Sequence, residues 1–346
     1  MKEKKISKDK FEDLLNTLKE KFLVLAPEEN DGVVEFKPLS ETFTALQRFS
    51  NSTRPVRTLF HLTFEPMFQY TNSEEGYVLD EVQTEEGKRV IFGVRPCDAN
   101  ALGIIDNLFK DTYEDSYYLK RRENTYIIGL GCDTHDDACF CTSLGVNPTF
   151  SQYTDLMVNL VEDSFILKVN TKKGEELLSD FADLSDAEDE EIQKLNEKEE
   201  KIKEGILRNV NLQNLDKKMR KYFENTSFWE KVSFKCITCG ICTYNCPTCH
   251  CFDIVDEEKE EGYGFRFRCY DSCAFPLFTK MPMENPRHFK WERVRQKVHH
   301  KFEYFPLNFG VIACVGCGRC IRQCPVNWDI TEVLNDITKT DDKSGE

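Results

Sequence analysis

Two short segments of the chain share one cysteine pattern, C-x2-C-x2-C-x3-C, and in both of them proline follows the fourth cysteine. This is the spacing of bacterial ferredoxins that bind two iron–sulfur clusters, in which the fourth cysteine of each run ligates the other cluster. A cubane cluster needs thiolates at several corners, and three closely spaced cysteines let one tight loop supply three of them. The pattern therefore predicts two 4Fe–4S clusters. Their ligands would be Cys236, Cys239, Cys242 and Cys324 for the first, and Cys314, Cys317, Cys320 and Cys246 for the second.

Gly240 and Gly318 stand just after the second cysteine of each run, where they relax the backbone of the loop. The exchanged fourth cysteines would pin the two distant runs together. The alternative is a pair of structural zinc sites. Zinc favours two separated cysteine pairs over a triplet followed by Cys-Pro, so the spacing favours iron.

Four further cysteines in the first half of the chain follow β-rich stretches. The segment "KRVIFGVRPCDANALGIIDNLF" runs from a predicted strand into a predicted helix, and "NTYIIGLGCDTHDDACFCTSLG" runs from a second strand into a loop. This order predicts an α/β unit with parallel strands. Open α/β sheets place their sites at the carboxyl ends of strands, and we predict a third iron–sulfur cluster there. Zinc and unligated buried thiols are the alternatives. The four cysteines are Cys97, Cys132, Cys139 and Cys141.

The last four cysteines are Cys249, Cys251, Cys269 and Cys273. Their number suits a fourth metal site, but the order C-x-C…C-x3-C matches no established ligand pattern. Two interpretations stay open for them: a fourth site, or small packing residues that form weak hydrogen bonds to cluster sulfurs.

Composition and charge indicate the cellular compartment and limit the kinds of partner. The chain has 16 cysteines, a charged N-terminus and no apolar run near the ~18 residues that a membrane-spanning helix needs. We expect a cytoplasmic protein with no membrane contact, whose thiols are reduced and serve as metal ligands. The net charge of −15 argues against nucleic-acid binding, which requires a basic face.

The predicted fold class is α+β. An α/β domain would span residues 1–178, a charged acidic linker 179–205, and a dicluster ferredoxin-like domain 206–346, with a helical insertion at about 252–308. Within the first domain, apolar residues at helical spacing predict an amphipathic helix that starts after Ser7, and 156–170 is predicted to be a hairpin.

In the insertion, Trp291, Val294 and Val298 share one face of a predicted basic helix. That helix either packs with a solvated cationic side or contacts an acidic partner or a reduced cluster. His135 is interpreted as a surface-loop residue. His299 and His300 would point to different faces. The sequence has no nucleotide-binding glycine motif and no hydrolase nucleophile motif, so it predicts a conduit for electrons without a substrate pocket.

With these segments in view, the chain resembles the iron–sulfur beta subunit of cytosolic NAD(P)-linked NiFe hydrogenases (sulfhydrogenases) and the corresponding electron-transfer subunit of anaerobic sulfite reductase. The resemblance covers residues 10–338 and is carried by "GVRPCDANALGIID", "GCDTHDDACFCTSLG", "CITCGICTYNCPTCHCFD", "YDSCAF", "NPRHFKWERVRQKVHHKFEYF" and "CVGCGRCIRQCP". The ferredoxin runs alone would be unspecific, and the other segments make it specific.

The resemblance implies an electron-transfer subunit that is not itself catalytic. Its partners would be a flavoprotein subunit that exchanges electrons with NAD(P)H through FAD, and a catalytic subunit that is a NiFe hydrogenase or, alternatively, a sirohaem sulfite reductase. The N-terminal quartet falls on cysteines of that family, and so do Cys249, Cys251 and Cys273. Cys269 departs from the family pattern, and Tyr270 stands where the family has Trp. A structural zinc-binding interaction protein is the third hypothesis.

Overall fold

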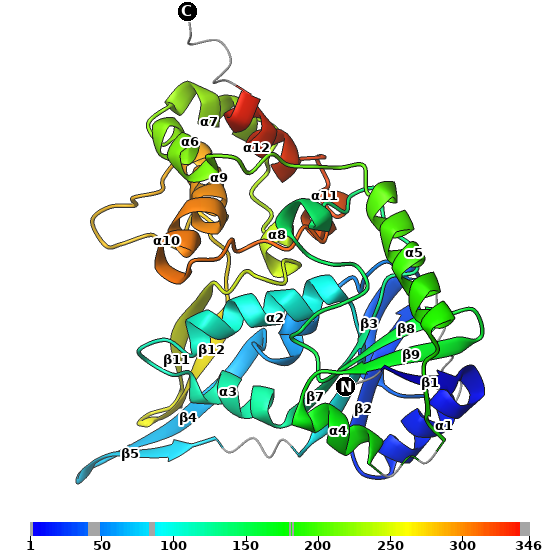
Figure 1. The fold of residues 1–346 in the computed structure, drawn as a ribbon. Helices are drawn as coiled ribbons and strands as arrows, with labels where there is room; N and C mark the ends of the chain where they lie inside the picture. Colours follow the sequence, from blue (N-terminus) through cyan, green and yellow to red (C-terminus); the bar gives the residue numbers. More distant parts are fainter. Residues whose placement is uncertain (1–2, 41–48, 83–86, 180, 182, 340–346) are drawn as a thin grey trace, which may run out of the picture.

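The computed structural model describes residues 3–40, 49–82, 87–179, 181 and 183–339. These residues form an eight-stranded sheet, a four-stranded sheet, and a group of helices that carries the two cysteine runs (Figure 1). The strand order of the large sheet is β10-β1-β9-β8-β7-β6-β2-β3. Its strands are β1 (Lys4–Ser7), β2 (Leu23–Asn30), β3 (Val33–Pro38), β6 (Arg89–Val94), β7 (Thr125–Leu130), β8 (Leu156–Val161), β9 (Ser164–Val169) and β10 (Ser185–Asp186).

The centre of the large sheet is parallel. Strands β2, β6, β7 and β8 pair in parallel, and antiparallel strands flank them on both sides. The side chains of β6 alternate between two cores, with Val90 and Phe92 in one and Ile91 in the other. The predicted α/β unit with parallel strands is confirmed, because buried parallel strands need apolar residues on both faces.

Helices cover both faces of this sheet. The first core contains residues of α1 (Lys8–Lys19) and α4 (Lys172–Leu178). The second contains residues of α2 (Pro96–Phe109), α3 (Ser116–Glu123) and the 3-10 turn η1 (Val56–Leu59). This three-layer arrangement leaves the carboxyl ends of β6 and β7 open at one edge of the sheet.

Two local predictions for this region are confirmed. Helix α1 starts after Ser7 and buries Phe11 against the sheet, although the Ser7 side chain makes no capping hydrogen bond. Residues 156–170 form the β8–β9 hairpin, which turns at Glu162 with a left-handed φ of 53°.

The acidic segment 180–204, of which residues 180 and 182 lie outside the described residues, contains helix α5 (Asp189–Gly205). Three acidic residues lie in its first turn, where their negative charges interact favourably with the positive end of the helix dipole. The residues of α5 are exposed or half-buried apart from Ile202, which is buried. Lys198 donates to the Leu160 carbonyl at 2.7 Å and so fastens the helix to β8.

The prediction of a helical insertion is wrong for residues 252–270. These residues form the hairpin β11 (Phe252–Glu260) and β12 (Tyr263–Tyr270), which joins β4 (Phe64–Ser73) and β5 (Gly76–Glu81) in the small sheet, in the order β11-β12-β4-β5. Aromatic residues at every second position of β12 and the turn at Gly262, whose φ is +77°, carry this signal. The sheet therefore draws strands from both halves of the chain.

The rest of the C-terminal half is helical. Helix α9 is confirmed, and its Val294 and Val298 pack in a core with Trp229 and Leu334. Its last turn continues as one π-helical segment, His300–Tyr304, which is labelled η3. These helices gather at the opposite end of the molecule from α1 and α4 (Figure 1). Their bounds are α6 (Leu215–Tyr222), α7 (Thr226–Ser233), α8 (Ile241–Tyr244), α9 (Lys290–His299), α10 (Phe305–Phe309), α11 (Arg319–Arg322) and α12 (Ile330–Lys339).

Candidate iron–sulfur sites

One small cavity between α9 and the second cysteine run is lined by all four predicted ligands of the second cluster. Cys314, Cys317 and Cys320 come from the run itself, and Cys246 comes from the first run. We call it the second site. Its walls include Phe140 and Ile330, which exclude water, and two lysines, Lys297 and Lys301. The exchange of fourth cysteines that the ferredoxin spacing predicts is thus compatible with the fold.

A neighbouring cavity, the first site, is lined by Cys236 and Cys242 together with Trp328 and Lys297. The backbone N–H of Trp328 donates to Cys324 Sγ at 3.2 Å, so the predicted fourth ligand lies beside the same wall. The N–H of Thr238 donates to Cys236 Sγ at 3.4 Å. Cys239 is exposed and is the outermost thiol of the set.

Left-handed glycines shape both loops, as the sequence predicts. Gly240 and Gly318 have φ values of +77° and +73°, and each precedes a one-turn helix that presents the third cysteine. A Cβ at Gly318 would lie 2.6 Å from the Ala138 carbonyl oxygen, and one at Gly316 would lie 2.5 Å from Cys141 Cα. The second run therefore lies directly against the loop that carries Cys139 and Cys141.

The N-terminal quartet follows the carboxyl ends of two parallel strands of the large sheet. Cys97 lies in the first turn of α2, directly after β6, and Cys132 follows β7. Burial, followed by the charges of neighbouring thiols, raises the pKa of Cys139 to about 11 and that of Cys141 to about 12. Cys132 contributes to the raised pKa of Cys139, Cys141 and Cys97. Cys97 and Cys141 also pack in one apolar cluster, together with Cys317 of the second run. We call the four N-terminal cysteines the third site.

The second and third sites are locked together by buried polar contacts. Arg319, the residue between Gly318 and Cys320, makes a bidentate pair with Asp98, the residue after Cys97, at 2.8 and 2.6 Å. Both side chains are almost completely buried. Asn51 donates to the Cys317 carbonyl at 2.8 Å, and the Phe140 N–H donates to the Gly316 carbonyl at 2.9 Å. Sequence reasoning missed Arg319 and Asp98, and only their position beside ligand cysteines could have indicated them.

Sequence reasoning also missed the two lysines. The Lys301 ammonium donates to Cys246 Sγ at 3.1 Å, to Thr248 Oγ1 at 2.9 Å and to the Ala313 carbonyl at 2.9 Å. Cys249 and Lys301 both lower the pKa of Cys246, the hydrogen bond from Cys249 being the larger effect. The basic residues of this segment are therefore only partly on a solvated face.

The remaining cysteines do not form a group of four. A hydrogen bond with Cys273 lowers the pKa of Cys251 to about 7, and Cys249 is hydrogen-bonded to Cys246. Cys269 instead lies on β12 opposite Asp253. Tyr270 stands where the related family has Trp. Its ring is buried, and its hydroxyl is within hydrogen-bond distance of the carbonyls of Thr243 and Cys249, so tyrosine fills this position with its polar group satisfied.

The histidines follow the sequence interpretation. His135 is exposed in its loop. His299 contacts Glu303 and Phe223, whereas His300 contacts His250 and Phe305. The two neighbouring histidines thus point to different sides of the helix and contact different residues, as predicted.

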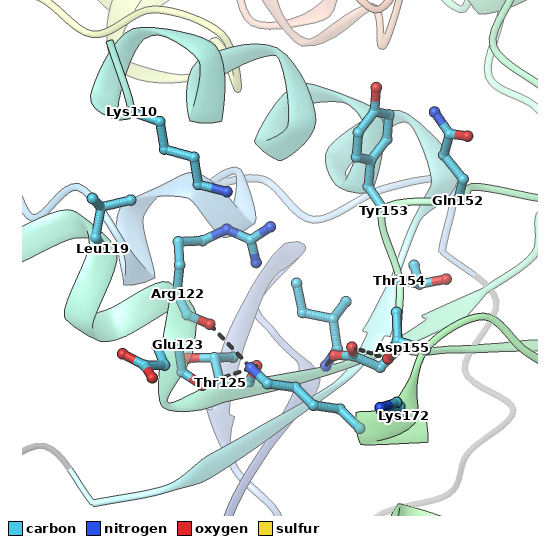
Figure 2. Close-up of a pocket in the computed structure, with 13 residues that line it drawn as sticks. Lys110, Leu119, Arg122, Glu123, Thr125, Gln152, Tyr153, Thr154, Asp155 and Lys172 are labelled. Atoms are coloured by element: carbon cyan, nitrogen blue, oxygen red, sulfur yellow. Dashed lines mark hydrogen bonds between the residues drawn. The ribbon is translucent and has the colours of Figure 1, made fainter. Parts of the chain in front are cut away.

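An open cavity of about 560 Å³ lies elsewhere, at the amino ends of β7 and β8 (Figure 2). Two of the cations that line it, Arg122 and Lys173, are held by neighbouring groups of the protein. Arg122 pairs with Asp106 at 2.9 Å, and Lys173 donates to the carbonyls of Arg122, Glu123 and Thr125. Because open α/β sheets bind ligands at the carboxyl ends of their strands, this cavity is not the functional site.

The donor set fits iron–sulfur clusters. All 16 cysteines lie in the described residues and all are free. The first two sites offer thiols in enclosed cavities, with N–H donors directed at sulfur, which is the environment that such clusters use. Within the described ranges, no three His, Cys, Asp or Glu side chains converge as for a single metal ion. No helix in the described part of the chain is both long and apolar enough to cross a bilayer.

Comparison with known proteins identifies first a domain type and then a similar protein. The family described as 4Fe-4S dicluster domain matches residues 235–328, which include both cysteine runs. Over 335 residues, 96% of this chain, the sequence is 29% identical to Sulfhydrogenase 2 subunit beta of Pyrococcus furiosus, and the match covers 97% of that protein. No solved structure matches the chain. The resemblance predicted from the cysteine segments is confirmed: the chain contains a 4Fe-4S dicluster domain and is similar over almost its whole length to a sulfhydrogenase beta subunit.

Proposed function

We propose that the chain is the electron-transfer subunit of a cytoplasmic hydrogenase complex. The observation that carries the proposal is the continuity of the three cysteine sites. Cys242 and Lys297 line both the first and the second cavity, and the second run lies against the loop of the third site through Gly316 and Gly318. Contiguous sites are what stepwise transfer of single electrons requires.

In this proposal each site holds one 4Fe–4S cluster, and thiolate-bound clusters of this kind supply one-electron transfer. The chain contributes the ligands, the exclusion of water and the hydrogen bonds to sulfur that adjust reduction potentials. Its ligand groups are those predicted from the sequence. The first is Cys236, Cys239, Cys242 and Cys324; the second is Cys314, Cys317, Cys320 and Cys246; the third is Cys97, Cys132, Cys139 and Cys141.

The order of the sites follows from their surroundings. The second site touches both of the others and is the middle of the series. Cys239 is exposed, so the first site is closest to a partner at its end of the molecule. Residues 1–178 would then carry the third site as one domain, residues 179–205 would connect, and 206–346 would carry the other two.

The partners are proposed from the homologue. Its name denotes one subunit of a hydrogenase, so this chain would work beside a flavoprotein subunit that uses NAD(P)H and a NiFe catalytic subunit. The comparison does not favour the alternative, in which the chain delivers electrons to the sirohaem subunit of a sulfite reductase. A fourth metal site is not part of the proposal, because Cys269 lies apart from the other three remaining cysteines.

The first test is the content of iron, acid-labile sulfide and zinc in protein purified without oxygen. Three clusters predict about twelve irons with equal sulfide per chain, and visible absorbance that bleaches on reduction and returns on reoxidation. The matched variant is Cys139→Ser with Cys269→Ser as control. Cys139→Ser should reduce iron to about eight, and Cys269→Ser should leave about twelve. Stoichiometric zinc without sulfide would refute the proposal in favour of a structural zinc protein.

The second test separates a conduit from an enzyme. The isolated chain should accept electrons from a chemical reductant and pass them to an artificial acceptor, with no turnover of NAD(P)H or hydrogen by itself. Turnover by the isolated chain would show that it holds a converter and would overturn the proposal.

A further inference from the structure

Lys297 lies in the last turn of α9 and is buried, with 6% of its surface exposed. It lines both the first and the second cavity. Its Nζ atom is buried and has no hydrogen bond of ordinary geometry among the described residues. The ring of Trp328, which lies in the wall of the first site, is 5.5 Å from this Nζ.

Lys301, four residues later and so on the same side of the helix, provides a contrast. Its ammonium is satisfied by a thiol, a hydroxyl and a carbonyl. It lines the second cavity and not the first. Lys301 is therefore a fixed part of one site, whereas Lys297 stands between two sites without such a set of fixed partners.

A buried ammonium without such partners is costly unless negative charge lies next to it. Cluster-bound thiolates would supply that negative charge, because the cavities that Lys297 lines also contain Cys242 and Cys320. Cys242 belongs to the first site and Cys320 to the second. The side chain thus keeps its charge beside ligands of both sites.

We infer that Lys297 is a charge shared by the first and second sites, and that it raises the reduction potentials of both clusters together. A cation beside a cluster stabilises the added electron, and charge and hydrogen bonds to sulfur are known levers on cluster potentials. Each transfer is a one-electron reduction in which no bond at Lys297 forms or breaks. This inference rests on the proposed function, because it requires clusters in both sites.

The test is a potentiometric titration of the anaerobically purified chain, followed by electron paramagnetic resonance, with iron and sulfide measured on each sample. The variants are Lys297→Met, which removes the charge, and Lys297→Arg, which retains it. Lys301→Met is the single-site comparison. Lys217→Met on the exposed face of α6 removes an equal charge far from the cavities and is the control.

For Lys297→Met we expect the equilibrium constants for reduction of two clusters to fall at least about tenfold, which is about 59 mV for a one-electron couple. Lys297→Arg should recover most of the shift, Lys301→Met should shift mainly one cluster, and Lys217→Met should shift none. Fully loaded Lys297→Met protein with unchanged potentials, or with only one cluster shifted, would overturn the inference.

If Lys297→Met loses iron, Lys297→Gln replaces it in the same titration, since its amide keeps donors without the charge. The expected result and the contradicting result are the same for that variant. Failure of this inference is distinguishable from failure of the proposed function. A wild-type chain without iron and sulfide would refute the function itself, whereas loaded clusters with insensitive potentials would refute only the role of Lys297.

Discussion

The two cysteine runs have the same spacing and opposite environments. In the first run the second cysteine, Cys239, is exposed, and the residue between the glycine and the third cysteine is Ile241. In the second run the corresponding residues are Cys317, which is buried, and Arg319, which is completely buried against Asp98. One loop lies near the surface and the other lies between two parts of the fold. Equal spacing therefore fixes the local loop, while the neighbours decide how each site is used.

The substitution with the largest expected effect on this difference between the runs is Arg319→Met. It leaves the Asp98 carboxylate buried without its partner, and we expect a loss of about 3–5 kcal/mol in the free energy of unfolding. The matched change in the first run, Ile241→Met, should cost less than about 1.5 kcal/mol. Denaturant unfolding of the loaded protein measures both.

The double variant Asp98→Leu with Arg319→Met removes both charges, and its loss should be smaller than the sum of the single losses. Equal losses for Arg319→Met and Ile241→Met would mean that the buried pair does not distinguish the two runs.

A second comparison uses the paired glycines. Gly240→Ala and Gly318→Ala both force a left-handed alanine, which costs roughly 1–3 kcal/mol. At Gly318 the new Cβ meets the Ala138 backbone, which must shift, whereas at Gly240 it meets the Phe275 ring at 2.7 Å, which can rotate. We expect Gly318→Ala to be the more destabilising and to release iron from the third site as well, as measured by iron content and thermal unfolding. The reverse order would contradict the packing of the second run on the 138–141 loop.

The exposure of Cys239 predicts a difference in lability. When oxidant or chelator removes iron under alkylating conditions, Cys239 should be modified at least about tenfold faster than Cys317, a difference of about 1.4 kcal/mol in apparent barrier. Mass spectrometry of peptides at short times gives both rates in one sample. Equal rates would mean that the two runs open together.

The smallest expected effect comes from Asn51→Ala. It removes the hydrogen bond to the buried Cys317 carbonyl and the one that Asn51 Oδ1 accepts from Arg322. Because the Arg322 side chain is partly exposed and can turn to water, we expect a cost of about 1 kcal/mol in unfolding free energy. Arg54→Ala is a comparison at an exposed position of the same segment, and its effect should be smaller, because exposed ion pairs contribute little. If Asn51→Ala lost as much unfolding free energy as Arg319→Met, the Asn51 amide would stabilise this contact as strongly as the buried ion pair, which would contradict the comparison.

Much of the fold could be predicted because its signals are local. Helix α1, the β8–β9 hairpin and the parallel pair β6 and β7 follow from the periodicity of apolar residues. The hairpin at 252–270 was missed because its strands are rich in charge and it completes a sheet with β4, which is distant in sequence. Strand pairs far apart in the chain leave little trace in local pattern.

The ligands of the candidate sites are predictions from the sequence, whereas their electrostatic surroundings are visible only in the structure. The cysteine spacing predicts exchanged ligand groups for the first two sites, because a tight loop can supply three corners of a cluster. Apart from the position of Arg319 beside a predicted ligand, nothing in the sequence separates Lys297 and Arg319 from the surface cations around them. Their burial depends on α9 and α11 lying against the cysteine loops, which is a property of tertiary packing.

By itself, the sequence determined the spacing of the two cysteine runs, the four cysteines that follow the parallel strands β6 and β7, and the net charge of −15. From these it predicts iron–sulfur chemistry. Only the tertiary structure decided how the sites adjoin, which cysteine reaches the surface and which cations lie beside sulfur. The physical reason is range. Loop geometry and strand periodicity are set by neighbours along the chain, whereas burial, and with it the strength of each charge, is set by residues that meet only when the chain has folded.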